Sequence, residues 1–202
     1  MSLEYLGIGL SLGVTAGISP GPLMALMISE TMKGGRMRGI KVAVAPLITD
    51  VPLILVITFV LRYIRSMHSL LGIISLVGSF LLLYFGYRDL QTGKISLQTG
   101  DVRSNSFRKG ILTNLLNPHP YVFWLFIGVP FMMKGSTAEK VLFVLSFLSG
   151  IVGSKIGITL IVEKSKSFIE TKYYHRIIQS LGVVLVFLGL ILLKDAIGYL
   201  LK

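Results

Sequence analysis

Two ionisable side chains of opposite charge lie inside long apolar stretches, and they are the residues of this sequence best suited to do chemistry. Asp50 lies in the stretch 42–61 and Lys155 in the stretch 141–162. Counted at about 1.5 Å per helical residue, both are expected roughly 12–13 Å from the same membrane face. A charge at that depth costs at least about 2.5–3.5 kcal/mol to insert into a bilayer. An ion pair would relieve that cost.

Three interpretations of these two charges remain open at this stage. A structural ion pair would lock two parts of the chain together. A functional pair would let Asp50 carry a proton or cation while substrate competes with Lys155 for it. The third interpretation has no pairing, with the Lys155 stem reaching toward the cytoplasm. We favour the functional one and assign ion coupling to Asp50 and Lys155, because an aspartate that alternates between a lysine and water changes its proton affinity with conformation.

Paired prolines interrupt two other apolar stretches, in Gly17-Ile-Ser-Pro-Gly-Pro22 and Asn117-Pro-His-Pro120. A proline has no N–H, so it frees the carbonyl four residues before it. Within a membrane, such backbone is tolerated only against protein or a water-filled cavity. A broken helix offers carbonyls on one side and N–H groups on the other, which suits both ends of a zwitterion. A packing kink is the alternative. The expected substrate-binding residues are Ser19, Pro20, Gly21, Pro22, Asn114, Asn117 and Pro118.

The elements that position these residues are expected to cross a membrane. Charged residues make up 14% of the 202 residues, against roughly 25% in a soluble domain, and 53% are hydrophobic. The mean hydropathy is +0.79. We therefore predict an all-α integral membrane protein with six transmembrane helices. The spans are predicted at 4–30, 42–61, 69–87, 110–133, 141–162 and 177–200.

Lysine and arginine counts predict the orientation of the chain. The loops after spans 1, 3 and 5 carry 13 of these residues and the opposite side carries 6. The positive-inside rule then places both termini on the outer side of the cell membrane. The net charge of +11 is explained in the same way, without nucleic acid.

The two halves of the chain repeat the same features in the same order. The proline pairs lie 98 residues apart, and each is followed by a span with one internal charge. Because three spans are an odd number, such repeats enter the membrane from opposite sides. We predict one transporter domain, 1–202, with two inverted three-helix repeats at 1–90 and 110–202, a cytoplasmic linker at 91–109, and broken helices 1 and 4.

Several side chains are assigned lesser roles. Glu30 is expected to be solvated at the inner end of span 1, Asn117 is ranked above Asn114 as a ligand, and Trp124 is given no special role. Small residues spaced by four in span 5 predict close helix packing, within the chain or in a homodimer. They form the stripes Ser146, Gly150, Ser154 and Ser149, Gly153, Gly157.

These residues together resemble the LysE/RhtB family of amino-acid exporters, over the whole chain. The resemblance implies export of amino acids or related metabolites driven by the proton gradient, and it carries over to Pro20, Gly21, Pro22, Asp50, Asn117 and Pro118. His119-Pro120 and Lys155 depart from the family pattern. The features that carry the resemblance are Gly17–Pro22, the loop Gly34–Gly39, Asp50, Asn117-Pro118 and the phenylalanines Phe123, Phe126 and Phe131.

The predicted function is therefore a secondary transporter that works by proton antiport and alternating access. Its expected partners are a small amino-acid substrate, protons and the lipid bilayer. We expect no cofactor and no metal, because the chain has no cysteine and three scattered histidines. An intramembrane enzyme would need paired catalytic groups, and only one acid lies deep. A small channel or a non-transporting membrane scaffold remains the alternative.

Overall fold

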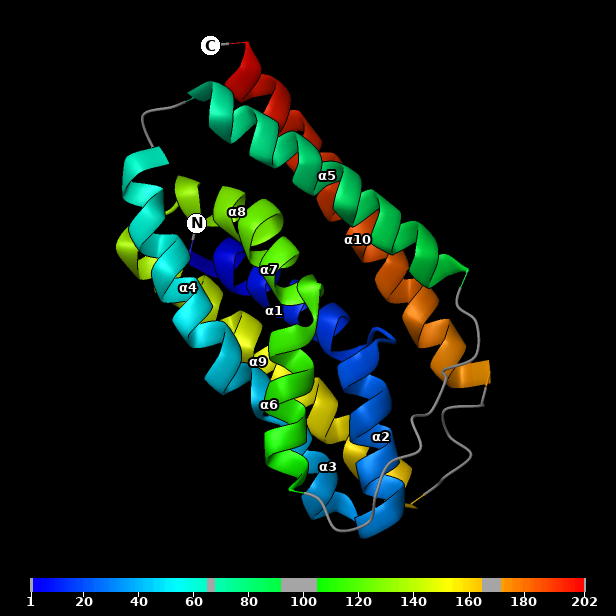
Figure 1. Cartoon of the computed structure of the whole chain (residues 1–202). Coiled ribbons are helices and arrows are strands. Elements are labelled where there is room, and N and C mark those ends of the chain that lie inside the picture. The colour runs from blue at the N-terminus through cyan, green and yellow to red at the C-terminus, as the bar shows by residue number, and fades with distance from the viewer. Residues whose placement is uncertain (1, 65–67, 92–104, 165–171, 202) are drawn as a thin grey trace.

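The computed structural model describes residues 2–64, 68–91, 105–164 and 172–201, and these ranges contain helices and no strand (Figure 1). The expectation of an all-helical chain is confirmed. Residues 92–104, which make up most of the predicted linker, lie outside the described ranges. The helices are α1 Ser2–Ile18, α2 Pro22–Gly34, α3 Arg36–Ala43, α4 Ala45–Ile64, α5 His68–Leu90, α6 Ser106–Leu116, α7 Pro118–Phe123, the π-helix η1 Trp124–Gly128, α8 Val129–Lys134, α9 Thr137–Lys164 and α10 Lys172–Leu200.

The first predicted span is broken where its prolines lie. Helices α1 and α2 meet at 60°, a bend visible in Figure 1. Gly21 adopts an extended backbone with φ −170°, and Pro22 is the first residue of α2. Proline suits that position, since its fixed φ fits a helix and the first-turn N–H groups have no partner within the helix. The break is thus a direct result of the sequence.

The fourth predicted span is interrupted twice. Asn117 is extended, with ψ 121°, which separates α6 from α7; the residue before a proline is biased toward that conformation. Further along, Trp124–Gly128 form a π-helix, and Pro130 follows at the start of α8. A single π-turn inserts an extra residue and rotates the side chains that follow it, and such turns are frequent at functional sites.

Three helices among the described residues are long and apolar enough to cross a membrane, or four if the bent α1–α2 pair counts as one span. The three are Arg36–Phe59, Thr137–Lys164 and Gly182–Leu200. The other helices overlap the ranges predicted for spans, and α5 contributes the shorter apolar stretch Gly72–Tyr87. A membrane-spanning helical fold is therefore supported, while the count of six spans and the inverted repeat stay predictions.

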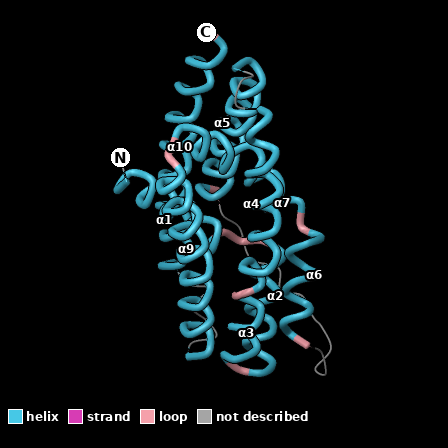
Figure 2. The backbone as a smooth tube through the Cα atoms, turned by 90° about the vertical axis from the view of Figure 1, so that its left-hand side faces the viewer, coloured by secondary structure: helices cyan, strands magenta, loops and turns pink. Residues whose placement is uncertain are grey.

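Helices α1 and α9 pack side by side along glycines (Figure 2). A Cβ atom at Gly9 or Gly13 would collide with the main-chain carbonyls of Phe143 or Phe147 in α9, and Gly150 is equally crowded by α1. The small residues therefore permit close backbone approach, as in membrane helix pairs generally. The stripe of Ser146, Gly150 and Ser154 thus packs within the chain, whereas a Cβ atom at Gly153 would meet nothing.

Two apolar clusters lie on either side of the helix breaks. One is centred on Trp124, Phe143 and Phe147, where α1, η1, α8 and the first half of α9 meet. The other contains Met24 and Val42, at the end where α2, α3 and the last turns of α9 meet. Helices α5 and α10 pack against each other alongside these helices (Figure 1) and add Leu82, Leu185, Leu188 and Leu192 to the first cluster. The breaks are thus held between two packed layers.

Candidate functional site

A cavity of about 400 Å³ lies at the two breaks, between α1, α2, α4, α5, α6, α7 and α9. Sites for small molecules commonly enclose about 300–1,000 Å³. The side chain of Pro118 lies outside the described residues. The other predicted site residues all line the cavity: Ser19, Pro20, Gly21, Pro22, Asp50, Asn114, Asn117 and Lys155.

Asp50 is 3% exposed and is held by three neutral donors. The Asn114 side-chain amide donates to its Oδ1 at 3.0 Å, and the Thr49 hydroxyl lies 3.0 Å from the same oxygen. The Trp124 indole N–H lies 3.4 Å from Oδ2, at the long end of hydrogen bonding. These donors stabilise a carboxylate without neutralising its charge, and they leave Oδ2 as the more weakly bound oxygen.

Asn114 uses both protons of its amide in this network. Besides the bond to Asp50, it donates to the Thr49 Oγ1 at 2.6 Å. The Thr49 hydroxyl also lies 3.1 Å from the carbonyl of Ala45, so its single proton serves either that carbonyl or Asp50. Asn114 thereby joins α6 to α4 and fixes the position of the Asp50 carboxylate.

Lys155 is also 3% exposed, and its ammonium group donates to the carbonyl of Gly17 at 3.1 Å. Gly17 lies in the last turn of α1, where the helix dipole concentrates negative charge and a cation is favourable. No ion pair within 4 Å joins Lys155 to Asp50, although both lie among the described residues. In this conformation the two opposite charges line one cavity without direct contact.

The break itself adds oriented backbone groups to the cavity. The carbonyl of Ala16 has no helical donor, since Pro20 lacks an N–H. The N–H groups of Leu23 and Met24 belong to the first turn of α2, which has no internal acceptors, and Gly21 provides no capping side chain. Ala16, Leu23 and Met24 all line the cavity. A negative helix end and a positive helix end therefore face the same space.

Asn117 and His119 organise the second break. The Asn117 Oδ1 accepts the N–H of His119 at 3.1 Å and so caps the start of α7. The His119 ring packs against Phe85 of α5, with ring centroids 4.8 Å apart. Asn117 and Asn114 both line the cavity, and Asn114 is the one that contacts Asp50, while their ranking as ligands stays a prediction.

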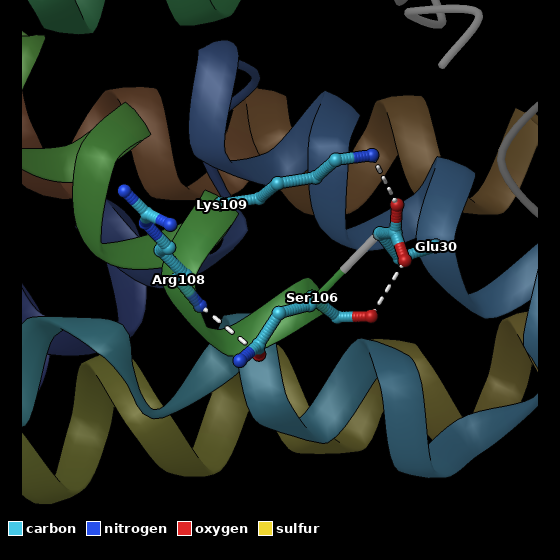
Figure 3. A network of polar contacts seen from close by, with 5 residues as sticks. Glu30, Ser106, Arg108 and Lys109 are labelled. Atoms are coloured by element: carbon cyan, nitrogen blue, oxygen red, sulfur yellow. Dashed lines mark hydrogen bonds and ion pairs between the residues drawn. The ribbon is translucent and has the colours of Figure 1, made fainter. Parts of the chain in front are cut away.

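Glu30 differs from its expected solvated position, since it is only 1% exposed. The Ser106 hydroxyl donates to its Oε2 at 2.6 Å, and the Lys109 ammonium donates to its Oε1 at 3.2 Å (Figure 3). The partners come from the start of α6, where Asn105 caps the helix. The α2 end distant from the break is therefore tied to α6 by a charged contact.

Sequence reasoning missed Thr49 and Trp124 as neighbours of Asp50. Thr49 precedes Asp50 directly, and Trp124 is the single tryptophan of the chain, within an apolar span. A buried indole usually finds an acceptor for its N–H, so Trp124 could have been flagged. Asp50 could not have been predicted as the acceptor, because the direction of the indole depends on the π-helix that begins at Trp124. The described residues contain no group of three or more potential metal-ligating side chains.

These features define a class of helical membrane protein, in which two interrupted helices surround a cavity that holds both charges. Secondary transporters are built in this way. The model of the LysE type translocator family matches residues 14–196, so the chain belongs to that family. Membership indicates membrane transport of small molecules, since the proteins of this family are transporters. No curated protein and no solved structure matches the chain significantly.

Proposed function

We propose that this chain exports amino acids or related small metabolites across the cell membrane by proton antiport. The observation that carries the proposal is the cavity at the breaks, which holds one acidic and one basic side chain, both buried. The substrate ammonium would approach Asp50. The carboxylate would approach Lys155 and the first turn of α2. Both ends of an amino acid thus find complementary charge.

Asp50 is the proposed proton carrier. Its neutral hydrogen-bond donors hold the carboxylate in place in either protonation state, whereas a lysine partner would oppose protonation. Substrate ammonium and proton would then compete for the same carboxylate. Such competition is sufficient to couple their movements in opposite directions, provided that the cavity opens to one side at a time.

The contacts between helices support two related halves, as alternating access requires. In two related halves, span 1 corresponds to span 4, span 2 to span 5 and span 3 to span 6. Each contact between two spans should then have a counterpart between the two corresponding spans. The packing of α1 on α9 corresponds to that of α6 on α3 and α4, and the contact of α1 with α10 corresponds to that of η1 with α5. We propose that the two arrangements interchange during transport.

Counterflow in proteoliposomes tests the function directly. Vesicles containing the purified protein are loaded with unlabelled amino acids and exposed to a panel of labelled ones, with and without an acidic lumen. We expect saturable exchange, with accumulation that increases when the lumen is acidic. Flux without saturation or counterflow would indicate a channel, and no flux from correctly folded protein would indicate a scaffold. Either result would reject the proposal.

In the proposed orientation, both termini lie on the outer side of the cell membrane and the α2–α3 connection lies on the cytoplasmic side. The chain contains no cysteine, so single cysteines report cleanly on topology. Met37 in α3 and Ala138 in α9 are both exposed. Met37→Cys and Ala138→Cys should be labelled by an impermeant maleimide from the inner and outer side respectively. Labelling of both from one side would reject the inverted-repeat model.

A homodimer stays a prediction. The residues Ser149 and Gly153 of α9 lie on its exposed side, where a second copy or lipid could pack. Cross-linking of the variant Gly153→Cys in membranes would detect a dimer that uses this face. Its absence would leave the proposed transport mechanism intact, because the cavity is lined by a single chain.

A further inference from the structure

Most of the wall of the cavity is apolar. Besides the prolines, and besides Ala16, Leu23 and Met24 at the first break, six apolar side chains come from α5, α7 and α9, which lie far apart in the sequence, and each of these three helices contributes one phenylalanine ring. The six side chains are Leu81, Phe85, Val122, Phe123, Phe147 and Ile151.

Charged groups in the wall are few. Asp50 and Lys155 are the only aspartate, glutamate, lysine or arginine residues among the described residues that line the cavity. The remaining titratable group is His119, whose ring is packed against that of Phe85. If a substrate ammonium and carboxylate occupy Asp50 and Lys155, as the proposed function requires, a third charge on the substrate finds no fixed opposite charge in this wall.

We infer that the cavity selects zwitterions with uncharged, apolar side chains, such as branched-chain or aromatic amino acids. This inference rests on the proposed function and specifies its substrate class. An apolar side chain gains from leaving water and contacting the phenylalanine-rich wall. A lysine or glutamate side chain would instead lose hydration without an ionic partner, which is far more costly than a poor apolar fit.

Phe85 is the residue of this wall that we assign to side-chain selection. It lies on α5, outside the helices that supply Asp50 and Lys155, so it can contact the substrate side chain without touching the charged groups. Its ring is held against His119 of α7. Phe80 provides a matched control on the same helix, because it is 60% exposed and does not line the cavity.

Exchange of separately labelled leucine, lysine and glutamate in proteoliposomes tests the inference. We expect leucine to exchange at least about tenfold faster than lysine or glutamate at equal subsaturating concentration. Lysine or glutamate exchanging as fast as leucine would overturn the inference while leaving amino-acid transport in place. No exchange of any amino acid by folded protein would reject the proposed function, and the inference with it.

Substitutions then test the wall itself. Phe85→Ala should lower the preference for leucine over alanine by about tenfold, with the exchange of alanine retained. Phe80→Ala should leave that preference unchanged. If Phe85→Ala fails to fold, Leu81→Ala tests the same wall and should also lower the preference. If folded Phe85→Ala or Leu81→Ala keeps the wild-type preference for leucine over alanine, the assignment of this wall to side-chain selection is overturned.

Discussion

Two buried acids of this protein, Asp50 and Glu30, are surrounded in contrasting ways. Asp50 lies at the cavity and is bound only by neutral donors. Glu30 is bound by Lys109 and by the Ser106 hydroxyl, and it does not line the cavity. A carboxylate whose charge is already neutralised by a cation contributes to holding helices together. A carboxylate without such a partner remains available for a proton or a cationic substrate.

The contrast separates the two roles by position along the bundle. Glu30 joins α2 to α6 at the end where the apolar cluster of Met24 and Val42 also packs. Asp50 and Lys155 lie nearer the breaks and line the cavity together with Ala16, Leu23 and Met24. In the proposed mechanism, the first region stays closed in this conformation and the second exchanges partners. The following substitutions test that division, beginning with the largest expected effect.

Asp50→Asn should abolish uptake driven by a pH gradient, by about 100-fold or more, since an amide cannot take up and release the proton. Exchange of substrate for substrate should persist. Labelled uptake into vesicles with an acidic lumen, compared with counterflow in the same vesicles, separates the two activities. Normal gradient-driven accumulation by this variant would show that Asp50 is not the coupling residue.

Lys155→Met should reduce substrate exchange by about 10- to 100-fold, the equivalent of losing a charged hydrogen bond of about 1.5–3 kcal/mol. Methionine keeps the length of the side chain and removes both the bond to Gly17 and the proposed contact with the substrate carboxylate. The dependence of the exchange rate on substrate concentration gives the affinity. An unchanged affinity would confine Lys155 to capping α1.

Asn114→Leu should lower gradient-driven uptake by about tenfold, corresponding to about 1.4 kcal/mol. Leucine occupies a similar volume but cannot hold the Asp50 carboxylate. Asn117→Leu is the control. It removes the cap of α7, which is worth about 1 kcal/mol of stability, and it should leave the ratio of gradient-driven uptake to exchange unchanged. Equal effects of the two variants on that ratio would contradict the special position of Asn114.

Glu30→Gln should have the smallest effect on transport. The amide retains a hydrogen bond with Ser106 and loses the charge that attracts Lys109, at a cost of about 1–3 kcal/mol in the free energy of unfolding. A lower Tm of the detergent-solubilised protein is therefore expected. The ratio of gradient-driven uptake to exchange should equal that of the wild type. Loss of gradient-driven uptake with exchange retained would give Glu30 the role that we assign to Asp50.

The sequence was sufficient to predict the features that depend on local chemistry. Two prolines separated by one residue disfavour a continuous helix, so the interruptions near Pro20 and Pro118 follow from residue types, whereas the single Pro52 lies inside α4 without ending it. The small residues around Gly150 likewise indicated a close helix contact, although the partner helix was left open. The similar predicted depth of Asp50 and Lys155 suggested an ion pair; the two residues line one cavity but form no ion pair in this conformation.

The remaining features depend on how distant segments meet. The expectation for Glu30 was wrong because this residue is buried and contacts Ser106, which is 76 residues away. The contact of Trp124 with Asp50 spans 74 residues and follows an irregular π-turn. The bond between Lys155 and Gly17 depends on the packing of α9 against α1. Residue types and helical periodicity do not specify such contacts.

The most direct test of the account is the movement of protons during substrate export. Vesicles containing the wild-type protein and an internal pH-sensitive dye are loaded with an exchangeable amino acid and diluted into substrate-free buffer, with membrane potential clamped by potassium and valinomycin. Antiport through Asp50 predicts that the lumen acidifies as substrate leaves, and that Asp50→Asn abolishes the acidification. Substrate efflux from the wild type without any change in luminal pH would contradict proton coupling at this site.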